Sequence, residues 1–532
     1  MELDGEGLTP EAVARIARTD APVVVPESAR ESIRRARERI TDVLATDEPV
    51  YGVTTGFGDL VDERVERDRL DDLQHNLVRS HAAGTGRELA PEEVRALLAT
   101  RCNALAVGHS GVRERVVDRL VDLLNVGIHP VVRSRGSLGA SGDLAPLAHA
   151  ALVLIGEGEA DVAPELVGEP ADADPVRLPG DEALAAAGLA PLTLAPKEGL
   201  ALINGTQLTV GLAALAVVDA ERLVRTADVA GALTTEVAMG TTVNCDAAIQ
   251  SVRPHVGQAA SARAVRRITA GSTVLDSHAD CDRVQDAYSV RCLPQVHGAA
   301  RDAVAHLREA VTVELNSATD NPLVFDADRA DDRASGTGQA AIVSGGNFHG
   351  APLAGRLDYL VGSLTSLASI CERRIDRLLN PHHQERHLPP YLARDPGVSS
   401  GLMIAQYTAA ALVSDLRQEG RAGTATTTPV SGGQEDHVSQ SATAAMAVRR
   451  AVERATTVVG IELLCATEAR AFVDDDLSLG AGTRAAHDAV RSVVPPVTAD
   501  RRLDGDIDRA AALVAGGFIE ERVREAIDEP LP

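Results

Sequence analysis

The strongest constraint on the fold is a long run of apolar residues with helical spacing between residues 353 and 378. Apolar side chains recur at steps of three and four, at Leu353, Leu357, Leu360, Val361, Leu364, Leu367, Ile370, Cys371, Ile375 and Leu378. This spacing places one apolar face along about seven turns of 3.6 residues. Asn380-Pro381 should end the helix. The pattern predicts a long helix within an elongated helical bundle.

Two further segments predict long helices, residues 438–471 and a run that follows Thr206 and continues past Leu223. Hydrophobic residues make up 45% of the chain but aromatic residues only 2%. The core must therefore be aliphatic and rich in alanine, which favours helices over sheets. Because 532 residues exceed one compact core, we expect at least two lobes. Residues 156–196, rich in Pro, Gly and Asp, should form a surface excursion between lobes.

The charge balance limits the partners that the protein can have. The chain has 52 basic and 77 acidic residues, a formal net charge of −25, and Lys197 is its only lysine. Such a surface repels nucleic acid and anionic membranes. It is also typical of salt-adapted proteins, so we expect stability and activity to need high salt.

The sequence also predicts a cytoplasmic protein. No segment reaches the roughly 18 apolar residues that a membrane span needs, and the acidic N-terminus lacks a signal-peptide pattern. The six cysteines are scattered, without a CxxC pair, as expected for free thiols in a reducing compartment. The histidines of "NPHHQERHLPP", from Asn380, follow a predicted helix end and precede two prolines. We expect a solvated loop there and no metal site.

A stretch of small residues precedes another expected helix, in "RGSLGASGDLAPLAHAAL" from Arg135. Ala140, Ser141 and Gly142 lie there between a glycine and Asp143. One interpretation is a turn in which Ser141 or Asp143 caps the helix. The other is a tight bend in which the Gly142 nitrogen attacks the Ala140 carbonyl, since glycine offers least hindrance. Loss of two waters would then leave a methylidene-imidazolone, an electrophile made from the chain itself.

The stretch resembles the signature of the histidine and aromatic amino-acid ammonia-lyases. Further stretches agree with this family in order: "YGVTTGFG" from Tyr51, "EGLALINGTQ" from Glu198, "QDAYSVRCLPQVHG" from Gln285, "NSATDNPL" from Asn316 and "SGGNFHG" from Ser344. The resemblance implies a mainly α fold of the fumarase/aspartase-like superfamily. Residues 1–200 would form an N-terminal lobe with the electrophile, and residues 201–532 the long helical bundle and C-terminal helices. It also implies homotetramers with shared active sites, and no diffusible cofactor beyond the ring of Ala140, Ser141 and Gly142.

The resemblance assigns catalytic roles. Tyr51 matches the base that takes the β-proton, which requires surroundings that favour phenolate. Arg291 matches the carboxylate-binding guanidinium, which can form two parallel hydrogen bonds. Tyr288 lies one turn from Arg291 if this stretch is helical. Without the motifs, Tyr51 would be read as a buried ring and Arg291 as part of a surface ion pair.

Five further residues match the substrate site. Asn204 and Gln285 match amides that steady the electrophile, and Phe348 matches a ring that packs near it. Glu435 in "QEDHVS" and His81 in "SHAAGTG" resemble the side-chain pocket of the histidine-specific branch. A carboxylate there can bind an imidazole and favour its protonated form. Taken alone, these residues could equally be capping amides, a core ring and a buried ion pair.

The activity that the resemblance implies is the conversion of L-histidine to trans-urocanate and ammonia, the first step of histidine degradation. The alternatives are a phenylalanine or tyrosine ammonia-lyase, or an aminomutase with the same electrophile. A non-catalytic helical scaffold is the alternative from a different class. The signature of the fumarase–aspartase lyases, "GSSxMPxKxNP", is absent.

Overall fold

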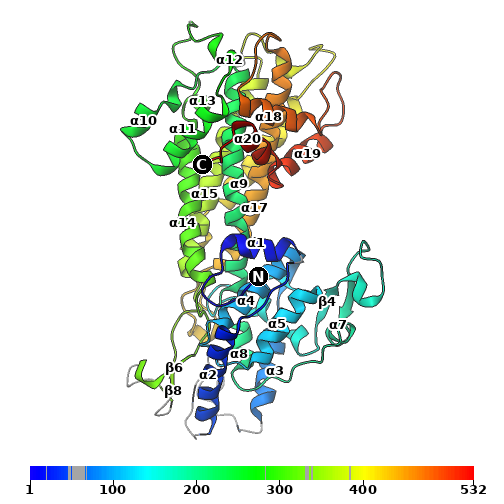
Figure 1. Ribbon diagram of the computed structural model, residues 1–532, viewed down its shortest axis with the longest axis vertical. Helices are drawn as coiled ribbons and strands as arrows, with labels where there is room; N and C mark the ends of the chain where they lie inside the picture. The colour runs from blue at the N-terminus through cyan, green and yellow to red at the C-terminus, as the bar shows by residue number, and fades with distance from the viewer. Residues whose placement is uncertain are drawn as a thin grey trace. The chain divides into compact units, whose positions relative to one another are not determined.

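The computed structural model describes residues 1–19, 21–45, 50, 66, 69–281, 283–329, 335–336, 340–382 and 385–532. Its elements are mostly helices, with three small antiparallel sheets among the described residues (Figure 1). The predicted mainly α fold is therefore confirmed.

Contacts divide the chain into two units, and each unit consists of three segments. Unit 1 comprises Met1–Leu215, Leu307–Leu357 and Gly423–Met446, and unit 2 comprises Ala216–His306, Asp358–Ala422 and Ala447–Pro532. Four of the five boundaries between the units fall inside long helices: α9 (Gln207–Val237), α14 (Leu293–Leu315), α15 (Ala351–Leu379) and α17 (Ser441–Ala469). These units are defined by contacts, whereas the division into residues 1–200 and 201–532 stays a prediction.

The three predicted long helices are confirmed as α9, α15 and α17. All ten apolar residues that predicted α15 are buried. Helix α15 ends at Leu379, immediately before Asn380-Pro381, and the Asn380 amide donates to the Asp376 carbonyl at 2.8 Å. Local periodicity was sufficient here because the apolar face and the stop signal both lie within the helix and its flank.

Unit 1 contains most of the short elements. Its helices are α1 (Pro10–Arg18), α2 (Glu27–Leu44), α3 (Leu70–His81), α4 (Pro91–Ala106), α5 (Glu114–Val126), α6 (Leu144–Leu154), α7 (Gly180–Ala186) and α8 (Glu198–Ile203). Its strands are β1 (Thr85–Glu88), β2 (Ile128–Pro130), β3 (Arg133–Arg135), β4 (Glu159–Val162), β5 (Val176–Pro179), β6 (Leu323–Asp326), β7 (Ser335–Gly336) and β8 (Ala340–Val343). Helix α4 is buried at every position from Glu93 to Ala106, so it forms the centre of this unit.

One expectation about this region is wrong. Residues 156–196 do not separate two lobes but lie entirely within unit 1. Strand β4 pairs there with both β2 and β5, and α7 follows directly. The sheet orders are β1-β3, β2-β4-β5 and β6-β8-β7. A composition rich in turn residues indicates loops, but it does not indicate which core the loops cover.

Unit 2 is helical throughout its described part. Besides its portions of the four long helices it contains α10 (Ala247–Ser251), α11 (Val256–Ile268), α12 (Thr273–Asp276), α13 (Tyr288–Arg291), α16 (Met403–Glu419), α18 (Ala481–Arg491), α19 (Asp504–Ala515) and α20 (Phe518–Ile527).

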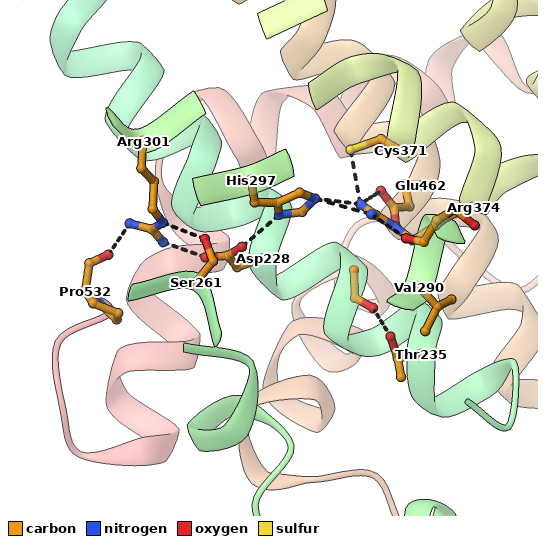
Figure 2. Close-up of polar contacts among 12 residues, drawn as sticks. Asp228, Thr235, Ser261, Val290, His297, Arg301, Cys371, Arg374, Glu462 and Pro532 are labelled. Carbon is orange, nitrogen blue, oxygen red and sulfur yellow. Dashed lines mark hydrogen bonds and ion pairs between the residues drawn. The ribbon is translucent and has the colours of Figure 1, made fainter. Parts of the chain in front are cut away.

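A row of four buried side chains, which we call the ionic row, joins the long helices within unit 2 (Figure 2). It consists of Asp228 on α9, His297 on α14, Arg374 on α15 and Glu462 on α17. Nδ1 of His297 lies 2.7 Å from Asp228 Oδ1, and Nε of Arg374 donates to Glu462 Oε1 at 2.5 Å. Both Arg374 terminal nitrogens lie 3.2 Å from Nε2 of His297. Charges on four helices therefore pair inside one core.

The ionic row leaves His297 neutral. Nε2 must accept from Arg374, so the ring proton is assigned to Nδ1, which donates to Asp228. Burial lowers the pKa of His297 despite that hydrogen bond. Burial alone would raise the pKa of Asp228, but the charge of Arg301 and the bond from His297 lower it. A proton added at His297 Nε2 would face a guanidinium and be disfavoured.

Other expectations concern absent features. None of the helices in the described ranges is long and apolar enough to cross a membrane. Among the same residues, no group of three or more His, Cys, Asp or Glu side chains is arranged to hold a metal ion. The cysteines are free, and four of them are buried.

Candidate active site

The segment of small residues lies between β3 and α6 in unit 1 and is bent by two glycines. Gly139 has φ of +67° and Gly142 has φ of +79°. Gly142 pairs with Gly205 in an isolated parallel bridge. A Cβ on Gly142 would lie only 2.2 Å from the Gly205 oxygen, so a side chain cannot fit. Both the backbone conformation and this close approach require glycine at position 142.

Asp143 is the N-cap residue of α6, but its side chain makes no capping bond there. The carboxylate instead accepts from the Thr209 amide at 2.8 Å, near the start of α9, and from the Ser137 hydroxyl at 2.8 Å. Burial raises the pKa of Asp143. Of the two predicted N-cap residues, Asp143 therefore occupies the position and Ser141 does not, but the Asp143 carboxylate connects the loop to α9 instead of capping α6.

Three other segments of unit 1 hold the loop. The Asn204 side-chain amide, which follows α8, donates to the Ser141 carbonyl at 2.7 Å. The Gly139 carbonyl accepts from the Ser439 hydroxyl at 2.9 Å and from the Gly350 amide at 3.2 Å. The loop is thus fixed by residues that lie far from it in the chain.

Glu435 lies directly at the loop. Its Oε1 accepts from the Ser141 hydroxyl at 2.5 Å, and its backbone carbonyl accepts from the Val430 amide at 3.1 Å. The glutamate is partly exposed, as is Ser141. A carboxylate is therefore within hydrogen-bond distance of the side chain that the electrophile would be made from.

His81 and Phe348 belong to the same unit. His81 ends α3, which packs against α6, and its Nδ1 lies 2.8 Å from the Leu77 carbonyl. We assign the proton to Nδ1, so Nε2 remains for another partner. Phe348 is half-buried in the segment that reaches Gly139 through Gly350.

The loop and its surroundings fit the expected methylidene-imidazolone. The bend and the bare glycine nitrogen suit a ring closed between Ala140 and Gly142. Asn204 Oδ1 is buried and has no hydrogen-bond partner among the described residues, although its amide nitrogen is bonded to Ser141. An unpaired buried acceptor is costly, so a donor at this position would stabilise the site.

The remaining predicted residues lie elsewhere. Gln285, Tyr288 and Arg291 belong to unit 2, and all three are exposed. Tyr288 and Arg291 begin and end α13, and the Arg291 Cζ lies 5.9 Å from the Tyr288 ring centroid. The predicted spacing of one helical turn is confirmed. Tyr51 and its glycine-rich segment lie outside the described residues.

Sequence reasoning missed the buried polar residues beneath the loop. Arg101 on α4 donates to the Asn204 carbonyl at 2.8 Å, and Lys197 donates to Asp320 at 2.8 Å. Lys197 is fully buried, with φ of +79°. Lys197 is the only lysine in the chain, and this isolation was a signal that its ammonium has a specific partner. Arg101 had a weaker signal, a charge within the apolar stretch "LLATRCNALAV".

Comparison with known proteins places the chain in a family. The profile described as aromatic amino acid lyase matches residues 8–492. The chain belongs to this family. It is 63% identical over 529 residues to a protein named probable histidine ammonia-lyase from Halobacterium salinarum, covering 99% of this chain and 98% of that protein.

Solved structures of aromatic amino acid lyases share the fold. The histidine ammonia-lyase of Trypanosoma cruzi matches with a TM-score of 0.88 at 36% identity, covering 99% of this chain and 95% of that one. The tyrosine aminomutase of Streptomyces globisporus matches with a TM-score of 0.90, also at 36% identity, and both chains are covered completely. The fold is that of the fumarase/aspartase-like superfamily. Because an ammonia-lyase and an aminomutase match equally well, the fold alone does not select the reaction.

Proposed function

We propose that the protein deaminates L-histidine to trans-urocanate and ammonia, the first step of histidine degradation. The observation that carries the proposal is the Glu435 carboxylate, 2.5 Å from the Ser141 hydroxyl. An acid beside the electrophile suits an imidazole and would be left unpaired by a phenyl ring. Relatives of 63% and 45% identity that cover nearly the whole chain are named as histidine ammonia-lyases, one of them as probable.

The cofactor of the proposed reaction is a methylidene-imidazolone formed from Ala140, Ser141 and Gly142. It would supply an electrophile that captures the substrate amine and makes it a better leaving group. Asn204 steadies this segment through its bond to the Ser141 carbonyl, and Gln285 is proposed to assist it. Phe348 covers it with an aromatic ring. No metal or diffusible cofactor takes part in the proposal.

The substrate is held at both ends. The Arg291 guanidinium grips the carboxylate through two parallel hydrogen bonds, with Tyr288 one turn away. Glu435 accepts from the imidazole and favours its charged form, and His81 completes the pocket with its free Nε2. Tyr51 accepts the β-proton as phenolate. Proton and carboxylate are thus handled by different side chains while the imidazole stays fixed.

We further propose a cytoplasmic homotetramer with active sites shared between subunits, as family resemblance implies. This arrangement would give the exposed residues Gln285, Tyr288 and Arg291 a role at a shared site. The net charge of −25 predicts a need for concentrated salt, because screening weakens repulsion between surface carboxylates. Measuring the unfolding midpoint and turnover across salt concentrations tests this, and full activity in dilute buffer would refute it.

The experiment that tests the function is a spectrophotometric assay in concentrated salt. Purified protein is offered L-histidine, L-phenylalanine and L-tyrosine separately. We expect urocanate from histidine and no product from the other two. Cinnamate or coumarate instead would retain the electrophile but overturn the role of Glu435. A β-amino acid product would identify an aminomutase, and no product at all would favour a non-catalytic scaffold.

A further inference from the structure

A buried guanidinium lies directly behind the peptide that pairs with the loop. Arg101 on α4 is fully buried, and it donates from one terminal nitrogen to the Asn204 carbonyl at 2.8 Å. A Cβ on Gly205 would lie 2.7 Å from the other terminal nitrogen of Arg101. The same peptide also faces the loop, because a Cβ on Gly142 would lie 2.5 Å from the Gly205 nitrogen. The next peptide is bonded to the loop, since the Gly205 carbonyl accepts from the Asp143 amide at 2.6 Å.

The position of Arg101 is itself fixed by buried neighbours. Its second terminal nitrogen donates to Gln207 Oε1 at 2.7 Å, and the Gln207 amide donates to the Thr319 hydroxyl at 2.7 Å. The next residue, Asp320, lies close enough to favour the charged guanidinium and is itself paired with Lys197.

Burial lowers the pKa of Arg101 to about 10, so the guanidinium stays charged at neutral pH. A charged donor forms a stronger bond to a carbonyl than a neutral one. Arg101 also lines a small cavity together with apolar residues of α6, including Leu147 and Ala151, whose side chains carry no hydrogen-bond donor for Asn204. The Asn204 carbonyl thus depends on this one guanidinium for a strong bond from behind.

We propose that Arg101 is a positioning residue that acts by holding the Asn204–Gly205 peptide. In this position the peptide orients the Gly142 nitrogen for attack on the Ala140 carbonyl carbon. It also keeps the Asn204 side-chain amide in its hydrogen bond to the Ser141 carbonyl. Ring closure forms the bond between that nitrogen and the Ala140 carbonyl carbon. One water leaves from the Ala140 carbonyl and a second from the Ser141 side chain. This inference rests on the proposed function, because the ring is its cofactor.

Helix α4 supplies a matched control for the opposing explanation, that Arg101 merely stabilises unit 1. Arg95 is a second buried arginine on the same helix, and it donates to the Ile16 carbonyl at 2.9 Å and the Leu124 carbonyl at 3.0 Å. These carbonyls belong neither to the loop nor to the segments that hold it. Replacing either arginine should cost stability, but only Arg101 should affect the ring.

The experiment compares wild type with Arg101→Met, Arg101→Lys and Arg95→Lys in the same concentrated salt. Intact mass gives the fraction of chains that are lighter by two waters, which reports ring formation without an activity assay. We expect complete conversion in wild type and Arg95→Lys, and a rate of conversion after refolding that is about tenfold lower in Arg101→Met. Arg101→Lys should be intermediate, because an ammonium keeps one charged donor but not the two-pronged geometry.

Kinetics on the converted fraction sharpens the result. We expect kcat to fall in the Arg101 variants while KM changes little, because the substrate carboxylate and imidazole are proposed to be held by other residues. If Arg101→Met does not fold, equal effects of Arg101→Lys and Arg95→Lys on the mass would overturn the inference. A folded Arg101→Met that converts as fast as wild type would also overturn it, while a wild type of full mass would overturn the proposed function itself.

Discussion

Two buried polar regions of the molecule differ in whether their atoms find partners within the chain. In the ionic row of unit 2, Asp228 is paired with His297 and Arg301, and Arg374 with Glu462 (Figure 2). At the loop of unit 1, by contrast, Asn204 Oδ1 is buried without a partner among the described residues. Charged groups that are already paired with one another have no capacity to bind a further group, whereas an unpaired buried acceptor can still accept a hydrogen bond from a ligand. The first region is suited to holding helices together and the second to chemistry.

Removing one hydroxyl from each region gives the largest expected contrast. Ser141→Ala removes the side chain from which the proposed electrophile would be made, so turnover should fall by several orders of magnitude with little change in stability. Thr234→Val removes the hydroxyl that donates to Glu462 at 2.9 Å. It should cost about 1–3 kcal/mol of stability and leave kcat near wild type. Turnover assays and denaturant unfolding check both, and a Ser141→Ala enzyme with normal turnover would contradict the distinction.

Breaking the ionic row should have the next largest effect. Arg374→Met leaves the fully buried Glu462 without its guanidinium, which should cost about 3–5 kcal/mol of unfolding free energy. The double variant Arg374→Met/Glu462→Leu should recover much of that loss, because it removes both charges. Intact mass should still report complete ring formation in both variants. Denaturant unfolding in constant salt measures the cost, and an unchanged midpoint in Arg374→Met would show that the row is not stabilising.

Neutralising Glu435 should have a smaller effect, and that effect should be on kcat/KM and not on stability. Glu435→Gln removes the proposed charged partner of the imidazole, so kcat/KM for histidine should fall by about 10- to 150-fold, corresponding to about 1.5–3 kcal/mol. Any residual phenylalanine turnover should change less. Glu462→Gln is the control, since it should lower stability rather than kcat/KM. A greater loss for phenylalanine than for histidine would count against histidine as the substrate.

The smallest expected effect is the loss of stability in the ionic row when the pH is lowered. Burial lowers the pKa of His297 below its usual 6.5, so the unfolded chain takes up this proton at a higher pH than the folded chain. Stability from this group is therefore present above pH 6.5 and is lost as the pH falls below it, by about 1.4 kcal/mol for every tenfold difference in proton affinity between the folded and unfolded chains. Asp228, whose pKa is also lowered, adds a loss in the same direction below pH 3.8.

The pH prediction is checked by measuring unfolding free energy between pH 7 and 5 at constant salt. His297→Gln keeps an amide beside Asp228 but does not titrate in this range, so its stability should change less with pH. Equal slopes for the two proteins would show that His297 does not titrate on unfolding in this range.

The sequence predicted features that depend on neighbours in the chain. Helix α15 was predicted in full because its periodicity and its stop at Asn380-Pro381 are local. The spacing of Tyr288 and Arg291 along α13 was predicted for the same reason. By contrast, Gly142 needs to be glycine because Gly205 approaches it from 63 residues away. A pattern of neighbouring residues cannot indicate that these two glycines approach each other in the folded chain.

The candidate site was predictable where motifs exist and hidden where they do not. Asn204 and Glu435, which the motifs singled out, both contact Ser141, and their roles in the reaction stay predictions. Arg101 belongs to none of the quoted motifs, and its effect on Asn204 is visible only once α4 is packed behind the loop. The N-cap position of Asp143 was predictable from the sequence, but the partner of its carboxylate was not, because Thr209 lies in the first turn of another helix.

Lys197 has a consequence for handling the protein. Its side chain is the only ε-amine in the chain and is fully buried against Asp320. Amine-directed dyes, cross-linkers and immobilisation resins will therefore find no lysine side chain on the folded molecule, and coupling through side chains can use carboxylates or the exposed Cys281 instead. The same burial turns Lys197 into a reporter. Modification of this residue, read by peptide mass, would record opening of the core around the Lys197–Asp320 pair.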